Sequence, residues 1–463
     1  MTSEVLFRRM QNMQTIILNR PEALNALNLN MVKQITPKLK VFEESPVTKS
    51  ILLTGEGSRA FCAGGDIKAL VAGQSKDPKD VAAAVGFMQN EYELNHYIGT
   101  IKKPFISLMN GISMGGGVGL SVHAPFRIAT ENTVFAMPET NIGLFPDVGG
   151  SFFLPRLDGE VGTFLGMTGQ RLKGVEVFMA GIATHYVPSE RLPALLERLG
   201  GLESDELEVI NAAIEEFVAE APGVDAWNKW ALGGENADAI SRCFSGNTLE
   251  EIVAALEKEG SAWAKNTLAT LKKMSPTSLK LTLEQLRRGR NEDFATCFRM
   301  EYRMVQETLQ NENFFEGVTA RLVEKRDPVW SPSWDELSSP KLSPQEITTK
   351  YFTKRQQLPP SLALIEQRLN FVNDLTYYEY PHRTLSGLPT DRDIKFVLES
   401  EKGDKGKTLD FFVQKWGSYS SRMIGKDETT LPRRSVFQFG SNRPKIGLVE
   451  KVESILARAG SKL

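Results

Sequence analysis

The sequence has few of the residues that mark secreted, membrane-spanning or metal-binding proteins. Its 463 residues include three cysteines, without CxxC spacing, and four histidines, with neither HxxxH nor HxH spacing. An odd and sparse set of cysteines fits a reduced compartment, and histidines so spaced give no reason to expect a metal site. No run of about eighteen apolar residues is present, so we expect no transmembrane helix.

The net charge is also small, but it hides an uneven distribution along the chain. The whole sequence has 55 Lys+Arg and 57 Asp+Glu, a net charge of −2. Residues 1–340 have 34 Lys+Arg and 43 Asp+Glu, a net of −9, and residues 341–463 have 21 and 14, a net of +7. A basic segment on an acidic body predicts a polyanionic partner for that segment.

The order of apolar segments predicts a fold of the α/β class. The hydrophobic fraction of 41% is ordinary for a soluble globular protein, and the length predicts two or three domains. The pattern predicts strands at residues 15–18, 50–54, 105–109, 126–129 and 134–136, and helices at about 28–42, 81–98 and 115–122. After residue 187 the spacing is almost wholly helical. Strand, turn and helix in this order predict stacked ββα turns.

Two glycine turns follow two of these strands. Gly64-Gly65 comes after the strand at 50–54, and Gly115-Gly116-Gly117 comes after the strand at 105–109. No Lys-Ser or Lys-Thr follows either turn, so neither is a phosphate-binding P-loop. One amide from each turn could bind a shared oxyanion, for which losing one donor costs about 2.7–4 kcal/mol of barrier. The alternative is that each turn only allows close packing of the backbone.

A series of motifs extends this pattern. In order along the chain they are NRP at 19–21, ALNAL at 23–27, AFCAGGDIK at 60–68, NGISMGGGVG at 110–119, AMPET at 136–140 and GLFPDVGG at 143–150. Together they resemble the crotonase (enoyl-CoA hydratase/isomerase) superfamily, and within it the 3-hydroxyisobutyryl-CoA hydrolases. The resemblance covers about residues 5–335. It implies a crotonase-type spiral of ββα units with a helical C-terminal region, followed by a basic extension.

The resemblance also implies a division of the chain into three parts. Residues 1–204 would form the ββα core with the CoA and acyl site, residues 205–335 the helical region of the hydrolase, and residues 336–463 a basic extension. Prolines and tryptophans mark a linker near 328–345. The extension mixes aromatic residues with Lys and Arg, which suits irregular or single-stranded RNA and equally suits a small protein-docking domain.

Five residues match functional positions of the resembled family. The amides of Gly65 and Gly116 would form the oxyanion hole, Glu139 would be the acid/base, and Asp147 would be the acid that distinguishes these hydrolases. Glu91 would line the acyl pocket. Glu91, Gly116, Glu139 and Asp147 would together bind the substrate. Each acid has a structural alternative. Glu139 could be a surface residue at a strand end, and Asp147 could be a turn-forming residue before glycine. Glu91 could lie on a solvated face of its helix.

The same match constrains the chemistry. Two carboxyls in apolar surroundings can have pKa values that are pushed apart, so that one is ionised while the other is neutral. The thioester could be hydrolysed by water that Glu139 activates, or through a covalent Glu139-acyl anhydride. Hydratases carry a second Glu where this chain has Gly119, so hydration is disfavoured. Cys62 is expected to be a packing residue rather than a nucleophile. Lys68 could lie near the coenzyme A phosphates or be an ordinary exposed lysine.

The resemblance implies two functions. The first is a mitochondrial matrix hydrolase that releases 3-hydroxyisobutyrate from its coenzyme A thioester in valine breakdown, with coenzyme A as part of the substrate and no separate cofactor. The second is a component of the small subunit of the mitochondrial ribosome, bound to rRNA and proteins through residues 336–463. No mitochondrial presequence or secretion signal is evident in the sequence, so import is inferred from the family. No membrane partner is expected.

Overall fold

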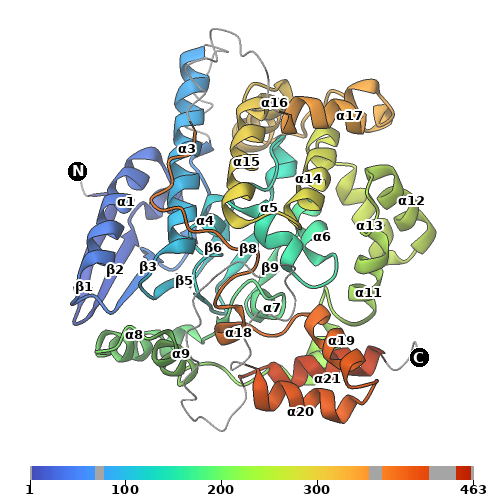
Figure 1. Cartoon of the computed structure of the whole chain (residues 1–463). Helices are drawn as coiled ribbons and strands as arrows, with labels where there is room; N and C mark the ends of the chain where they lie inside the picture. The colour runs from blue at the N-terminus through green and yellow to red at the C-terminus, as the bar shows by residue number, and fades with distance from the viewer. Residues whose placement is uncertain (1–2, 68–77, 354–367, 417–444, 460–463) are drawn as a thin grey trace.

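The computed structural model describes residues 3–67, 78–353, 368–416 and 445–459 (Figure 1). Within these ranges no helix combines the length and the apolar character that a membrane crossing requires. The predicted strands and most of the predicted helices are present, and the chain forms two sheets surrounded by helices.

The larger sheet has six strands in the order β1-β2-β3-β5-β7-β10. These are β1 (Val5–Met10), β2 (Met13–Leu18), β3 (Ser50–Gly55), β5 (Phe105–Met109), β7 (Phe126–Ala129) and β10 (His185–Tyr186). Only β1 and β2 pair antiparallel, and the other pairs are parallel. All five residues of β5 are buried, as expected for a central parallel strand covered on both faces.

Three strands of the smaller sheet each follow a strand of the larger one. It consists of β4 (Ala60–Cys62), β6 (Ile112–Met114), β8 (Val134–Ala136) and β9 (Leu172–Lys173), in that order. Thus β3 leads into β4, β5 into β6 and β7 into β8, and β4, β6 and β8 pair in parallel. This repeated succession is the spiral of ββα turns that the sequence predicted.

Helices follow the strands and cover both sheets. Those of the N-terminal part are α1 (Leu29–Glu44), α3 (Pro78–Thr100), α4 (Gly116–Gly119), α5 (Gly150–Phe153), α6 (Val161–Thr168), α7 (Val175–Met179) and α8 (Leu192–Gly200). Asn28 caps α1, since its side chain accepts a hydrogen bond from the amide of Met31. The helix predicted over 115–122 is the single turn α4, because the hydroxyl of Ser121 bonds the carbonyls of Gly117 and Val118 and competes with the helical pattern.

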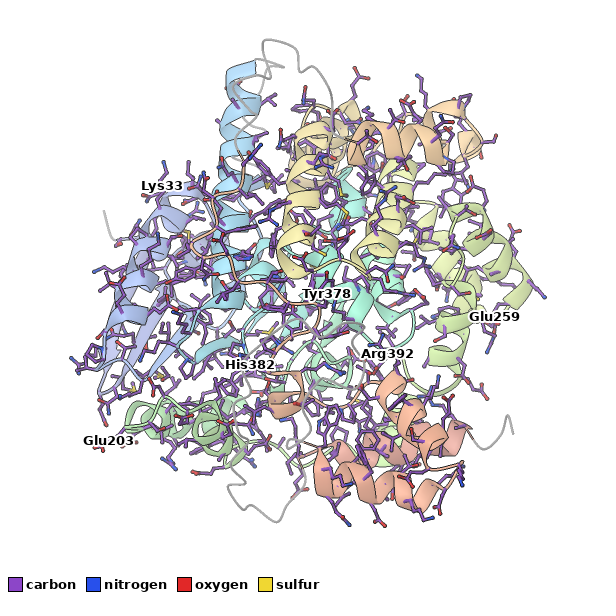
Figure 2. The ribbon with its side chains drawn as sticks, viewed as in Figure 1. Lys33, Glu203, Glu259, Tyr378, His382 and Arg392 are labelled. Atoms are coloured by element: carbon purple, nitrogen blue, oxygen red, sulfur yellow. The ribbon has the colours of Figure 1, made fainter. Side chains whose placement is uncertain are left out.

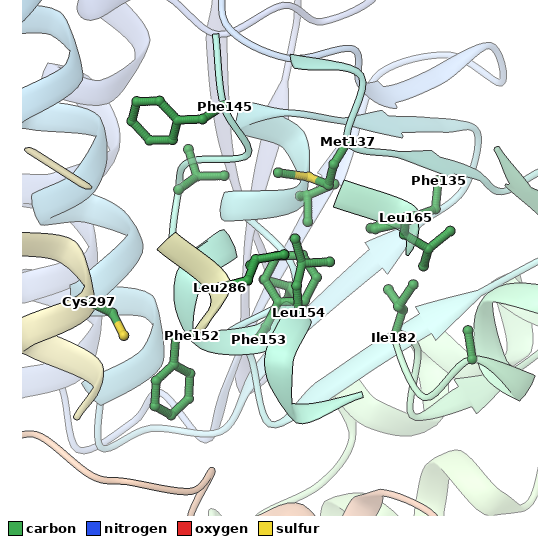
Figure 3. Packing of buried hydrophobic residues seen from close by; sticks show 14 of the residues in the cluster. Phe135, Met137, Phe145, Phe152, Phe153, Leu154, Leu165, Ile182, Leu286 and Cys297 are labelled. Atoms are coloured by element: carbon green, nitrogen blue, oxygen red, sulfur yellow. The ribbon is translucent and has the colours of Figure 1, made fainter. Parts of the chain in front are cut away.

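A helical region covers the spiral. It contains α9 (Leu207–Glu215), α10 (Val224–Lys229), α11 (Gly234–Cys243), α12 (Leu249–Glu259), α13 (Ala262–Leu271), α14 (Pro276–Gly289), α15 (Phe294–Thr308) and α16 (Glu312–Val318). Figure 3 shows how Leu286 and Cys297, from α14 and α15, pack beside Phe152, Phe153 and Leu154 of the spiral. The buried apolar core is therefore continuous between the two parts.

The segment near 328–345, predicted as a linker, is fixed to the body. The Trp330 ring nitrogen donates to the Lys273 carbonyl at 3.0 Å. The Lys280 ammonium donates to the carbonyls of Leu337 and Leu342 at 2.9 and 3.1 Å. Leu342 itself is buried. Proline and tryptophan content misled the prediction, because these residues serve here as anchoring contacts.

The described residues of the extension are folded onto the body. Its helices are α17 (Pro344–Ile347), α18 (Arg383–Ser386), α19 (Asp391–Ser400), α20 (Lys405–Lys415) and α21 (Leu448–Ala459). Between α17 and α18, residues 368–382 cross the α3 and α15 helices as an extended segment, drawn in orange in Figure 1. Tyr378 and His382 mark this path in Figure 2.

This crossing segment, residues 368–382, makes specific contacts with α3 and α15. The Asn370 amide donates to the Glu93 carboxylate at 2.7 Å, and the Phe371 ring stacks on His96 with centroids 3.8 Å apart. The Tyr377 ring stacks on Phe294 at 4.6 Å. These aromatic rings fill the body's surface, so they are not free to stack on RNA bases, as the composition had suggested.

Two basic residues of the extension form ion pairs with acidic residues of the body. Lys445 pairs with Glu215 at 2.5 Å and Lys451 pairs with Asp158 at 2.6 Å, each joining α21 or the residues before it to the body. The described residues of the extension contain 13 Lys+Arg and 12 Asp+Glu. Most of the predicted basic surplus therefore lies in residues 354–367, 417–444 and 460–463, outside the described residues.

Candidate active site

The two glycine turns predicted to share an oxyanion lie side by side. Gly65 follows β4 and forms an isolated parallel bridge with Leu27, and Gly116 is the first residue of α4. A Cβ atom built on Gly116 would lie 3.1 Å from the Gly65 amide nitrogen. Within the described residues, neither amide donates a hydrogen bond to another group of the protein. Two adjacent unpaired amides are the arrangement that an acyl oxyanion requires.

Glycine is required at Gly116 by close approach. The Cβ built there would lie 2.2 Å from Oε1 of Glu91, so any side chain at this position would displace the Glu91 carboxyl. Glu91 extends from α3 and is only 2% exposed, whereas Glu93, two residues later, is half buried and bonds the extension. The prediction that the two glutamates face different directions, with Glu91 facing inward, is confirmed.

Glu139 borders the same place from the other side. It begins the short 3₁₀ helix η2 (Glu139–Ile142) directly after β8. Its Oε1 lies 3.0 Å from the Cβ position of Gly115, and Glu139 is 4% exposed. Oε2 of Glu139 and Oε1 of Glu91 are both buried, and neither has a hydrogen-bond partner in the part of the chain that the structure describes. Buried polar atoms normally have partners, so these two oxygens are available to a ligand.

Asp147 is the third buried carboxyl, at 5% exposure. The hydroxyl of Tyr92, on α3 beside Glu91, donates to its Oδ2 at 2.7 Å. Burial raises the pKa of Asp147 to about 6, although the Tyr92 hydroxyl opposes this shift. Burial also raises the pKa values of Glu139 and Glu91, and the Asp147 charge raises them further. Ionisation is thus easiest at Asp147, which among the described residues is the only one of the three carboxyls that accepts a hydrogen bond from a side chain.

The loop that carries Asp147 is held from two helices. The Gln285 amide of α14 donates to the Pro146 carbonyl at 2.5 Å. Glu301 of α15 accepts hydrogen bonds from the amides of Gly149 and Ser151, both at 2.8 Å. Val148 lies between these anchors with a φ of +51°. This left-handed conformation costs a β-branched residue about 1–3 kcal/mol, so the surrounding contacts must impose it.

The position at which hydratases carry a second glutamate is closed. A Cβ on Gly119 would lie 2.6 Å from Oδ1 of Asn95 and 2.6 Å from the Val148 Cβ. Asn95 lies one turn after Glu91 on α3, fully buried, and neither its oxygen nor its nitrogen has a hydrogen-bond partner among the described residues. The structure therefore gives a steric reason for the missing acid and places an unpaired amide beside it.

Two further sequence expectations concern the first glycine turn. Cys62 is fully buried, and burial raises the pKa of its thiol to about 12, so it stays protonated near neutral pH. This agrees with a packing role and not with a nucleophile. Lys68, considered for the coenzyme A phosphates, lies outside the described residues.

The structure brings Gly65, Gly116, Glu91, Glu139 and Asp147 to one place. Sequence reasoning had not identified Tyr92, which donates to Asp147, or Glu301, which holds the loop of Asp147. It had also not identified Asn95, which lies beside Gly119. Tyr92 adjoins Glu91, and only the fold shows that its hydroxyl reaches Asp147.

Comparisons with known proteins agree with this geometry. The sequence profile described as enoyl-CoA hydratase/isomerase matches residues 13–345. The mitochondrial 3-hydroxyisobutyryl-CoA hydrolase of Homo sapiens is 48% identical over 331 residues, covering 71% of this chain and 84% of that protein. Small ribosomal subunit protein mS47 of Neurospora crassa is 43% identical over 430 residues, covering 89% of this chain and 82% of that protein.

Solved structures show the same fold. The crystal structure of a carnitinyl-CoA dehydratase from Mycobacterium thermoresistibile has a TM-score of 0.70 at 31% identity and covers 81% of this chain and 100% of that chain. That of an enoyl-CoA hydratase from Rhodobacter sphaeroides has a TM-score of 0.66 at 36% identity, covering 76% and 97%. The chain belongs to the enoyl-CoA hydratase/isomerase family, in the crotonase superfamily, and is similar to both the 3-hydroxyisobutyryl-CoA hydrolases and mS47.

Proposed function

We propose that this protein is a mitochondrial matrix acyl-CoA thioester hydrolase that acts on 3-hydroxyisobutyryl-CoA and is also a component of the small subunit of the mitochondrial ribosome. One observation carries the catalytic part. The paired amides of Gly65 and Gly116 lie beside the buried carboxyl of Glu139, whose pKa is raised by the nearby charge of Asp147. The alternative is a free hydrolase of valine breakdown that does not join a ribosome.

The amide pair would bind the thioester carbonyl oxygen. As water attacks the acyl carbon, the negative charge that develops on this oxygen is stabilised by two donors that are already in position. Coenzyme A enters as part of the substrate, and the chemistry requires no other cofactor. Because the site is buried, the donors act where water does not compete with them.

The carboxyl pair would move the protons. Asp147, ionised and held by Tyr92, takes a proton from the attacking water, and the neutral carboxyl of Glu139 donates a proton to the departing sulfur. The two protons then redistribute through product release and solvent. This assignment follows from the separation of the two pKa values, since the more acidic member is the base and the less acidic member is the acid.

A covalent route is the chemical alternative. Ionised Glu139 would attack the acyl carbon to form a mixed anhydride, which water would then open. A single turnover in ¹⁸O-labelled water detects the covalent route when water opens the anhydride at its Glu139 carbonyl. Direct attack places the label only in the hydroxyisobutyrate, whereas attack of water on the Glu139 carbonyl of the anhydride would place it in the Glu139 side chain, which peptide mass spectrometry detects. Label in Glu139 would refute the direct route.

Glu91 would recognise the hydroxyl group of the acyl chain. Its unpaired Oε1 lies next to Gly116, where the acyl carbon would be held. A buried oxygen that pairs only when the substrate brings a hydroxyl group favours hydroxyacyl thioesters over plain ones. The name of the human relative, a 3-hydroxyisobutyryl-CoA hydrolase, supports this substrate.

The ribosomal part of the proposal is supported by how far the similarity extends. The match to the ribosomal protein mS47 covers 89% of this chain and so includes residues beyond 345, where the family profile ends. The match to the human hydrolase covers 71%. The extension, residues 336–463, would therefore provide the contacts with rRNA and ribosomal proteins. In the described residues these contacts would involve protein more than RNA, because charges there nearly balance.

Purified protein tests the catalytic part. We expect wild-type protein to hydrolyse 3-hydroxyisobutyryl-CoA, and the Glu139→Gln and Asp147→Asn variants to lose at least about 100-fold in kcat, as expected when a proton-transfer group is removed. Thermal melting must remain within a few degrees for each variant. Wild-type protein that releases no more thiol than Glu139→Gln would contradict the proposal.

A further inference from the structure

The loop of Asp147 has a third anchor, which begins in the extension. The Nε2 atom of His123 lies 2.7 Å from the carbonyl oxygen of Val148, and its Nδ1 atom lies 2.7 Å from the hydroxyl of Tyr380. Val148 directly follows Asp147 and has the left-handed φ of +51°. The extension therefore reaches the residue next to a proposed catalytic carboxyl through a single histidine.

The chemistry of these contacts fixes their direction. A carbonyl oxygen only accepts, so Nε2 of His123 must carry the proton that it donates to Val148. Nδ1 of the neutral ring is then an acceptor, and the Tyr380 hydroxyl donates to it. Burial lowers the pKa of His123 to about 3, which keeps the ring neutral. The Tyr380 hydroxyl therefore donates to the His123 ring, and the His123 ring donates to the Val148 carbonyl. The other neutral tautomer of His123 could not make both hydrogen bonds.

Tyr380 is well placed to orient this ring. It is partly buried among aromatic neighbours, with its ring centroid 5.1 Å from Phe152 and 6.1 Å from His123. On the other side, the His123 ring packs edge-on against Phe294 at 5.0 Å. A built Cβ on Gly149 would lie 2.4 Å from the His123 ring, so the histidine lies directly against the loop.

From these contacts we infer that Tyr380 of the C-terminal extension is a positioning residue for the thioester hydrolysis proposed above, acting through His123 to hold the strained Val148 and, with it, the Asp147 carboxylate. The inference rests on that proposed function. Tyr380 lies after residue 345, where the family profile ends. The extension thus completes the active-site scaffold of the body to which it is attached.

The test compares two single-hydroxyl deletions in the full-length protein. Tyr380→Phe removes the donor to His123. Tyr377→Phe is the matched control, because Tyr377 is buried in the same segment and its hydroxyl donates to the Gly99 carbonyl at 3.1 Å, at the far end of α3. We expect Tyr380→Phe to lower kcat about 3- to 10-fold, the range for one neutral hydrogen bond, with KM within about two-fold. Tyr377→Phe should change kcat by less than about two-fold.

A second comparison separates positioning from general loosening. Val148→Gly makes the left-handed conformation free of strain, so the histidine contact no longer has to enforce it. In the Val148→Gly background, Tyr380→Phe should therefore change kcat by less than about two-fold. The same loss of kcat in both backgrounds, or equal losses for Tyr380→Phe and Tyr377→Phe, would overturn the inference.

The His123 ring can also be observed without catalysis. The chain has only four histidines, so the ¹⁵N shifts of the ring nitrogens can be assigned by NMR. Tyr380→Phe should shift Nδ1 of His123 toward the value of a free acceptor, and Tyr377→Phe should leave it unchanged. If wild-type protein hydrolyses no thioester, the hydrolase proposal fails and the catalytic role of Tyr380 fails with it. An active wild type with an unchanged His123 spectrum in Tyr380→Phe refutes this inference alone.

Discussion

Replacing Tyr92 with phenylalanine tests the assignment of Asp147 as the ionised carboxyl. The change removes the one side-chain hydroxyl that donates to Asp147, at 2.7 Å, and leaves the aromatic ring in place. A hydrogen bond to a charged group contributes about 1.5–3 kcal/mol, and each pKa unit corresponds to about 1.4 kcal/mol. Starting from a pKa of about 6, the variant should therefore titrate about one to two units higher.

The consequence is a loss of activity that depends on pH. Raising the pKa of an acid lowers its ionised fraction at a given pH, so the ascending limb of the kcat/KM profile moves to higher pH. At pH 7 the ionised fraction of Asp147 falls from about 0.9 to between about 0.5 and 0.1, so activity should fall about 2- to 10-fold. The ratio of wild-type to variant activity should return toward one near pH 9.

Thioester absorbance measured from pH 5 to pH 9 provides the assay. Tyr97→Phe is the matched control, since Tyr97 lies on the same helix and its hydroxyl donates at 2.7 Å to Glu43, away from the three carboxyls. The control should leave the profile in place. A Tyr92→Phe profile that coincides with wild type, or that is lowered equally at every pH, would refute the reasoning.

Three further outcomes follow from the structure. Gly119→Ala should lower the free energy of unfolding by about 1–3 kcal/mol in urea titration, because its Cβ would overpack against Asn95 and Val148, and an unchanged midpoint would contradict this. Lys445→Met should cost about 1–3 kcal/mol at pH 7 by leaving partly buried Glu215 without its cation. Burial raises the pKa of Glu215, but the charges of Lys445 and His185 hold this pKa well below its ordinary value. The ion pair therefore stabilises the folded protein at pH values above the pKa of an unfolded glutamate. This stabilisation must shrink as the pH falls below about 5. Isobutyryl-CoA, which lacks the hydroxyl, should show a kcat/KM about 10- to 100-fold below that of 3-hydroxyisobutyryl-CoA because Glu91 is left unpaired, and Glu91→Gln should narrow this gap.

Much of the fold could be predicted because its signals are local. The strand at Phe105–Met109 is a continuous apolar run, and Asn28 caps the helix whose buried residues recur at helical spacing. The glycine turns and the two acids could be placed by motif. Their convergence depends on the spiral, which brings residues 65, 91, 116, 139 and 147 together, and no local pattern encodes that distance.

The behaviour of the extension could not be predicted, because its composition fits several structures. Basic and aromatic residues suit RNA, yet Tyr377 and Lys451 are buried against the body and Tyr380 is partly buried there. Such residues pack on the body instead of binding RNA when the body has apolar and acidic side chains opposite them. Here it offers Phe294 and Asp158, and only the tertiary structure shows this.

The central claim is that one protein both hydrolyses a thioester and belongs to the ribosomal small subunit. The most direct measurement is sedimentation of mitochondrial lysates from cells that carry either wild-type protein or Glu139→Gln as the sole copy, with 3-hydroxyisobutyryl-CoA hydrolysis assayed across the gradient. The account predicts that both proteins travel with the small subunit and that only the wild-type fraction hydrolyses the substrate. Wild-type protein that stays at the top of the gradient, or a small-subunit fraction no more active than that of Glu139→Gln, would contradict it.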